Sequence, residues 1–226
     1  VVGIIAAISG ALLVQFGTAL PWFVGGTVMG TAGVLAMIFM REEDEFVHQN
    51  FSWRAGLASM KETILASARY SKGNSAVRFI LIASLVQFFA VQAPNMQWQP
   101  FFGQFVPITS FGFLSASMTI TLMVGGGMAP RFLRYVRDER RAISLAQAVI
   151  GVGICLTVAF SSFLPALAMF LVHEIARGIF VPLKDVYLND NIPSKERATL
   201  ISFDAISHHV GGMVGLLVSG WLAHSF

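Results

Sequence analysis

The sequence predicts an all-α, polytopic membrane protein with about seven transmembrane helices, and the main reason is where its charges are missing. Residues 1–40, 79–130 and 142–173 contain no Lys, Arg, Asp or Glu. One helix needs ~20 apolar residues to cross a bilayer, so each stretch fits two spans joined by an uncharged turn. The composition agrees, because 55% of the residues are hydrophobic and 12% are charged, against ~25% charged in soluble domains.

The fifteen basic residues fall in three windows, 41–78, 131–141 and 177–197. Connectors rich in Lys and Arg stay on the cytoplasmic side of a membrane. We therefore expect a multi-pass protein of the plasma (inner) membrane whose loops 41–76, 131–141 and 184–197 are cytoplasmic. The bilayer then accounts for the net charge of +3 without a nucleic-acid partner, and the single Cys155 leaves no intrachain disulfide.

The individual spans follow from these stretches and from the residues that break them. Gly17 and Pro21 separate the first two spans, and Arg41 ends the second. Pro and Ser residues within 100–107 and 161–165 mark two further outside turns. The expected spans are about residues 1–15, 22–40, 77–98, 112–130, 142–160, 165–183 and 200–222.

A polar connector, residues 41–76, separates residues 1–40 from residues 77–226. Trp53, Leu57, Met60 and Ile64 recur in it at helical spacing, with charged residues on the other faces. This pattern predicts an amphipathic helix on the membrane surface or against the cytosolic helix ends. A plain solvated linker is the alternative.

Glycines three or four residues apart occur in the second and seventh spans, at Gly26 and Gly30 and at Gly211, Gly212 and Gly215. Small residues at this spacing let helix backbones approach closely in lipid. We expect helix-packing contacts there, with sliding surfaces as the alternative. A further run, 125–127, stands at the expected end of the fourth span.

The sixth span carries His173, Glu174 and Arg177 near its middle. Spacings of three and four residues place all three on one helix face. Ionisable groups inside the hydrocarbon are costly and need a partner, a cavity or a function. We expect a proton-coupling charge pair here, and the alternative is a static Glu174–Arg177 ion pair that fixes helix packing.

Two other spans carry candidate polar sites. In the seventh span, Asp204 and His208 are four residues apart and form a second candidate for proton handling. The alternative is that Asp204 caps the helix or pairs with a loop arginine.

In the third span, the expected substrate-binding residues are Gln87, Gln92, Asn95 and Trp98. Amides and aromatic rings facing a cavity can bind varied organic molecules, and Pro94 is expected to kink the helix. Interhelical hydrogen bonds and an interfacial aromatic belt are the alternative.

The sequence does not predict an enzyme, a metal site or a cofactor site. His173-Glu174 resembles the start of the two-histidine zinc motif, but Arg177 occupies the position of the second histidine. The glycine run 125–127 lacks the Lys-Ser/Thr that follows a phosphate-binding loop.

The pattern as a whole resembles the major facilitator superfamily of secondary transporters, in which two six-span halves are joined by a long cytosolic connector. Residues 191–199, Asn-Ile-Pro-Ser-Lys-Glu-Arg-Ala-Thr, are similar to the link between spans ten and eleven in drug-efflux-type members. The five arginines within 131–141 are similar to the basic loop between spans eight and nine, although Pro130 stands where the family commonly has Asp before the first arginine.

The resemblance implies that the chain covers spans five to eleven of twelve, with the N-terminal spans of the same protein as its partner. It implies alternating access and transport of a small organic solute, such as drug or metabolite efflux by an antiporter, coupled to protons or another ion. Glu174 would accept the proton beside Arg177, the third span would contact the substrate, and the arginines of the gating loops would be Arg131, Arg140, Arg141 and Arg197. A seven-span receptor or signalling protein is the alternative.

Overall fold

The computed structural model describes residues 2–40, 52–54, 56, 58, 61, 64–65, 69, 72–192 and 197–225. These residues form α-helices and one short 3-10 helix, and the described part of the chain contains no strand. The chain divides into two compact units, Val1–Ser59 with Pro107–Ala116, and Met60–Val106 with Ser117–Phe226.

The first unit contains α1 (Val2–Val14), α2 (Leu20–Phe39) and the 3-10 helix η1 (Ile108–Ser110). Helix α1 contacts both α2 and η1. Gly17 adopts a φ of 151° in the turn between α1 and α2, a conformation that glycine reaches without steric cost. Pro21 lies in the first turn of α2, where its missing N–H leaves no helical hydrogen bond unmade.

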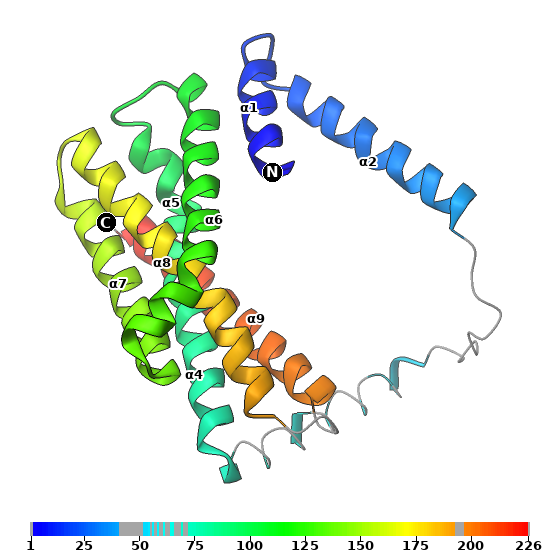
Figure 1. The fold of residues 1–226 in the computed structure, drawn as a ribbon. Coiled ribbons are helices and arrows are strands. Elements are labelled where there is room, and N and C mark those ends of the chain that lie inside the picture. Colours follow the sequence, from blue (N-terminus) through cyan, green and yellow to red (C-terminus); the bar gives the residue numbers. More distant parts are fainter. Residues whose placement is uncertain are drawn as a thin grey trace. The chain divides into compact units, whose positions relative to one another are not determined.

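The second unit holds most of the remaining helices (Figure 1). They are α4 (Ser75–Ala90), α5 (Gln92–Phe102), α6 (Phe111–Val136), α7 (Glu139–Ala159), α8 (Phe163–Asp190) and α9 (Arg197–Ser225), of which α6 starts in the first unit. Among the described residues, six helical segments are long and apolar enough to cross a membrane, with α4 and α5 counted as one. This confirms the all-α membrane fold for six of the expected spans. The first expected span corresponds to α1, which has 13 residues in the described part of the chain. This is shorter than the ~20 residues that a membrane crossing needs.

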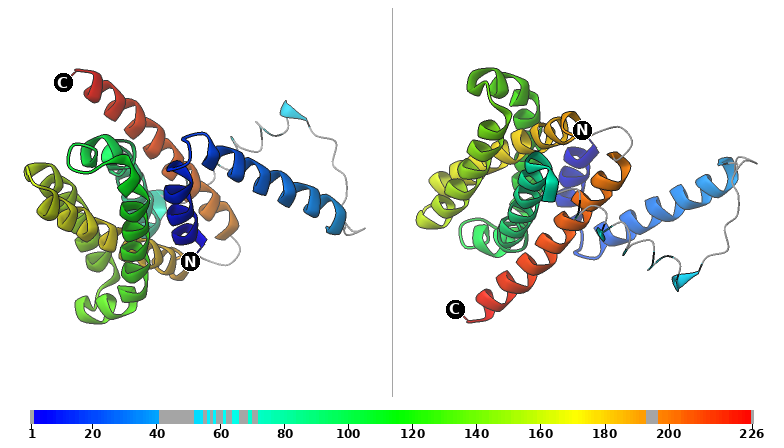
Figure 2. Two further views of the ribbon diagram at one scale, coloured as in Figure 1. Left: turned by 90° about the horizontal axis from the view of Figure 1, so that it is seen from above. Right: turned by 90° about the horizontal axis from the view of Figure 1, so that it is seen from below.

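Two helix pairs organise the second unit. Helix α7 packs along α8, and α4 packs along α9, as the views in Figure 2 show. Buried side chains from α4, α7 and α8, among them Ile80, Ile143, Ile150 and Phe180, form one continuous apolar core. The helices α4, α8 and α9 meet at three polar residues, Ser84, Lys184 and Asp204.

The kink expected at Pro94 lies at Val91, where α4 ends and α5 begins. A helical residue at position 94 would donate its N–H to the carbonyl of Ala90, and proline has no N–H. The interruption therefore appears one turn before the proline. Pro100, which the sequence places in an outside turn, lies inside α5.

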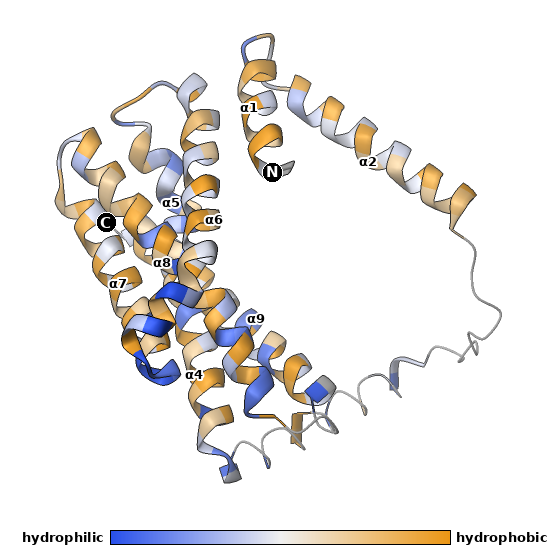
Figure 3. Ribbon diagram, in the orientation of Figure 1, coloured by the Kyte–Doolittle hydropathy of each residue, from blue (hydrophilic) through white to orange (hydrophobic). Residues whose placement is uncertain are grey.

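The expected basic loop 131–141 is mostly helical, which corrects its boundaries. Helix α6 continues through Pro130 to Val136, and α7 starts at Glu139. The turn consists of Arg137, with a φ of 59°, and Asp138, whose carboxylate accepts the backbone N–H of Arg141. Figure 3 shows the resulting group of hydrophilic residues where α6 passes into α7. The expected loop 184–197 also starts later, because α8 extends to Asp190.

Close helix crossings occur at some of the glycines. A Cβ on Gly211 would lie 3.0 Å from the carbonyl carbon of Leu85, and a Cβ on Gly215 2.9 Å from the Cα of Phe89. The packing role predicted for the seventh span is thus confirmed at these two positions. A Cβ on Gly26 or Gly30 would meet no described atom within 4 Å.

The connector helix expected around Trp53 and Ile64 stays a prediction. Leu57 and Met60, two of the four residues on which it depends, lie outside the described residues. The described Trp53 side chain is exposed.

Candidate functional site

Glu174 and Arg177 of α8 form the ion pair that their spacing predicts. Arg177 Nη1 donates to Glu174 Oε1 at 2.8 Å. The Glu174 side chain is 8% exposed and that of Arg177 is 24% exposed. The carboxylate is therefore buried, while the guanidinium reaches an open surface.

Helix α5 supplies a second partner for Arg177. The guanidinium Nη1 lies 3.5 Å from Oδ1 of Asn95, a long hydrogen bond between residues 82 positions apart. Of the predicted amides, Asn95 is thus the one that contacts the charge pair. This arrangement joins a candidate substrate contact to a candidate proton acceptor.

His173, the third residue of the predicted group, is completely buried. Its Nδ1 donates to the carbonyl of Phe170 at 3.0 Å. Its Nε2 lies 3.9 Å from Glu174 Oε1 and has no hydrogen-bond partner among the described residues. With Nδ1 as the donor, Nε2 carries a lone pair next to the carboxylate, so it is a second possible proton acceptor within the same face.

A second buried ion pair joins α8 to α9 and α4. Lys184 Nζ lies 2.6 Å from Oδ2 of Asp204, and Ser84 Oγ donates to Oδ1 of the same carboxylate at 2.5 Å. All three residues are buried. This corrects the alternative in which Asp204 pairs with a loop arginine. His208, its expected partner, stacks instead on the ring of Phe88.

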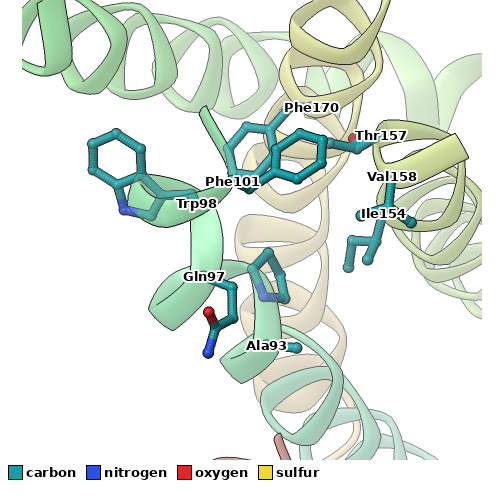
Figure 4. Close-up of a pocket in the computed structure, with 9 residues that line it drawn as sticks. Ala93, Gln97, Trp98, Phe101, Ile154, Thr157, Val158 and Phe170 are labelled. Atoms are coloured by element: carbon teal, nitrogen blue, oxygen red, sulfur yellow. The ribbon is translucent and has the colours of Figure 1, made fainter. Parts of the chain in front are cut away.

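A pocket beside α5 is lined by Trp98 but not by the other predicted substrate residues, Gln87, Gln92 and Asn95. Gln87 is buried on α4, and the Gln92 amide nitrogen would lie 3.1 Å from a Cβ on Gly212 of α9. Trp98 lines a pocket of about 240 Å³. Its other lining residues come from α5, α7 and α8: Ala93, Pro94, Gln97, Phe101, Ile154, Thr157, Val158 and Phe170. Figure 4 shows the α7 side chains across from Ala93 and Gln97.

Arg140, one of the gating-loop arginines, makes side-chain hydrogen bonds to two other helices, α8 and α4. It donates from Nε to Tyr187 Oη at 2.5 Å and from Nη2 to Ser75 Oγ at 3.1 Å. Its guanidinium also lies 5.8 Å from the ring centroid of Phe79. Arg140 therefore ties the start of α7 to α8 and α4.

Like Arg140, the other three arginines of that group are exposed. Arg131 lies on α6 and Arg141 on α7. Arg197 Nη2 lies 3.4 Å from the carbonyl oxygen of Asn189. In the described part of the chain, no group of His, Cys, Asp and Glu is arranged to hold a metal ion.

The family model of the Major Facilitator Superfamily matches residues 109–226, just over half of the chain. The chain belongs to the Major Facilitator Superfamily. It is therefore a multi-pass membrane protein from a family of secondary transporters, which are not enzymes, and this assignment favours transport over the receptor alternative. No curated protein and no solved structure gives a significant match.

The structure of this superfamily member adds three polar residues that the sequence does not single out: Lys184, Ser84 and Tyr187. Lys184 falls in the expected loop 184–197, one residue beyond the expected end of the sixth span at residue 183. Its position seven residues after Arg177 returns it to the same helix face after two turns, and this spacing could have identified it. Ser84 and Tyr187 carry no such signal, since their partners come from distant parts of the chain.

Proposed function

We propose that the protein is a proton-coupled secondary active transporter of a small organic solute that works by alternating access. The observation that carries this proposal is the buried carboxylate of Glu174 paired with Arg177, which is in turn within reach of Asn95. A charged pair inside a membrane helix is costly unless it serves a purpose.

The depth of the pair supports a site near the membrane midplane. Glu174 lies eleven residues after the start of α8 at Phe163, which corresponds to ~17 Å along the helix axis. This is about half of the ~30 Å hydrocarbon thickness. Superfamily transporters bind substrate and coupling ion near the midplane, so the position fits a coupling site.

The proposed coupling step is an exchange of partners at Arg177. A proton on Glu174 removes the negative charge that holds the guanidinium. Arg177 is then free to interact with Asn95 or with an acceptor group on the solute, and His173 Nε2 provides a nearby site for the proton. By this route a proton on Glu174 would promote solute binding at the guanidinium, as in a symporter, whereas a solute that contacts the Glu174 carboxylate itself would compete with the proton, as an antiporter requires.

The finer assignments rest on the resemblance. The chain would supply spans five to eleven of twelve, with α5 and α8 lining a central cavity that the N-terminal spans complete. Gln87, Gln92 and Trp98 would contact the solute in conformations that expose them to that cavity. The resemblance of residues 191–199 to drug-efflux-type members favours an efflux antiporter of the plasma membrane.

The test measures proton movement that is driven by solute. The full-length protein as its gene encodes it is reconstituted into liposomes that contain a pH-sensitive dye, and a panel of small organic solutes is screened for coupled proton flux. For a solute that gives flux, Glu174→Gln should abolish the coupled proton signal. Asp190→Asn, which removes an exposed carboxylate from the end of the same helix, is the matched control and should retain it. Wild-type coupling in Glu174→Gln would remove Glu174 from the mechanism.

A further inference from the structure

We propose that the turn between α6 and α7 binds the headgroup of an anionic phospholipid. The site consists of Arg134, Arg137 and Arg141, and we call it the arginine turn. The proposal involves neither Glu174 nor Arg177, so it is independent of the proposed function.

The arginine turn lies at the depth of a membrane surface. Helix α6 runs from Phe111 to Val136, and Arg131 comes 20 residues after its start, which corresponds to ~30 Å along the helix axis. This length equals the ~30 Å thickness of the hydrocarbon core, so the residues that follow lie level with the lipid headgroups. Tyr135 is 86% exposed, which agrees with this depth because tyrosine is enriched at membrane–water interfaces.

The positive charge of this segment is not neutralised by the described part of the protein. Residues 131–141 contain five arginines but two carboxylates. One of the two, Asp138, caps α7 by accepting the backbone N–H of Arg141. Arg140 is used inside the protein, in the contacts described above. The three arginines of the site are exposed, and they form no ion pair with the residues that the structure describes.

Arg137 occupies a backbone position that suits glycine. It follows directly after α6 and has a φ of 59°, in the left-handed region that residues with a Cβ seldom adopt. The residue that ends a helix in this conformation is usually glycine. An arginine is unfavourable for the backbone there, which favours a role for its side chain. A partner outside the protein chain would supply that role.

An anionic phospholipid fits the site in charge and in position. The planar guanidinium group of arginine binds phosphate oxygens through paired N–H donors. The three arginines come from the last turn of α6, the connecting turn and the first turn of α7, so a single headgroup can reach all of them. Basic residues beside a membrane helix strengthen the binding of anionic lipid by about fivefold each. A phosphatidylglycerol headgroup has no positive group of its own, whereas phosphatidylcholine carries an ammonium that would repel the arginines.

Two other anions could compete for the same arginines. A soluble organic phosphate has the chemistry of a headgroup, and the connector contains four acidic residues at 42–45, which lie outside the described residues. The membrane favours the lipid, because it holds headgroups at the depth of the turn at high local concentration.

The experiment compares two lipids with the same acyl chains, phosphatidylglycerol and phosphatidylcholine. Their binding to the full-length protein in detergent is titrated by native mass spectrometry. The wild type should prefer phosphatidylglycerol, and the triple variant Arg134→Gln, Arg137→Gln and Arg141→Gln should lose this preference, by up to ~100-fold. The matched control is Arg54→Gln, Lys61→Gln and Arg69→Gln, which removes three exposed charges from the expected cytoplasmic connector and should retain the preference.

A single variant separates the side chain of Arg137 from its backbone, and it decides the matter if the triple variant does not fold. Arg137→Gly should bind phosphatidylglycerol about fivefold more weakly but unfold at a higher temperature without lipid, because glycine adopts this φ without steric cost.

Four results would each overturn the proposal and leave the proposed function standing. They are equal binding of the two lipids by the wild type, an unchanged preference in the triple variant or in Arg137→Gly, an equal loss in the connector control, and displacement of the lipid by the same concentration of glycerol phosphate. A preference that emerges only after residues 42–45 are neutralised would assign the site to the connector instead.

Discussion

The crossing of α6 and α8 depends on glycine, and replacing Gly125 by alanine should destabilise the protein. A Cβ on Gly125 would lie 2.9 Å from the carbonyl carbon of Ile175 and 3.0 Å from its Cα, and closer still to the carbonyl oxygen. Gly178 faces the same crossing, since its Cβ would lie 2.9 Å from the backbone nitrogen of Gly126. The neighbours are backbone atoms, which cannot rotate away.

The size of the effect follows from two opposing terms. Restoring a carbon–carbon distance of ~3.5 Å requires the helices to separate by at least ~0.6 Å. Overpacking of this kind costs ~1–3 kcal/mol, and a rigid backbone neighbour places the cost at the upper end. The higher helix propensity of alanine returns about 1 kcal/mol. The net expected loss is about 2 kcal/mol.

The same helix provides the control. A Cβ on Gly127 would meet no described atom within 4 Å, so Gly127→Ala should keep or slightly raise the stability. The assay is the thermal unfolding midpoint of the full-length protein in detergent, measured for both variants beside the wild type. If Gly125→Ala unfolds at or above the midpoint of Gly127→Ala, α6 and α8 do not cross as described.

Three further substitutions test single contacts by the same assay. Ser84→Ala removes a hydrogen bond to a buried carboxylate and should cost ~1.5–3 kcal/mol; an unchanged midpoint would show that Asp204 does not need the hydroxyl. Asn74→Ala removes the side chain that caps the start of α4 and should cost ~1 kcal/mol, whereas Asn74→Asp should retain the cap. Arg140→Lys keeps the charge but not the forked geometry that reaches Tyr187 and Ser75 together, and it should cost ~1 kcal/mol; equal stability of the two proteins would contradict the role of this contact.

The membrane helices could be predicted because their signal is local and strong. Each charge-free stretch must be helical to satisfy its backbone in lipid, and the Glu174–Arg177 pair follows from a spacing of three within one helix. The helix ends were harder to predict. Arg131 and Arg134 lie within α6, because the long aliphatic part of an arginine lets a helix continue while the charge reaches the interface.

Contacts between different helices could not be predicted from the sequence, for a different reason. Lys184 and Asp204 lie on different helices, and Asn95 is 82 residues from Arg177. Hydrophobic periodicity identifies the face of a helix but not the helix that covers it. The pairing of α4 with α9, which buries Ser84 against Asp204, could be known only once the packing was known.

The two ion pairs have a consequence for how the helices that carry them should respond to membrane voltage. Glu174 with Arg177, and Asp204 with Lys184, each sum to zero charge. Moving one elementary charge across the membrane changes the energy by ~2.3 kcal/mol per 100 mV, but a neutral pair that moves as a unit contributes almost nothing. Rearrangements of α8 and α9 should therefore be electrically silent while both carboxylates are ionised. A proton that binds at Glu174, as proposed above, would add one positive charge, so a voltage-dependent transport rate would test that proposal.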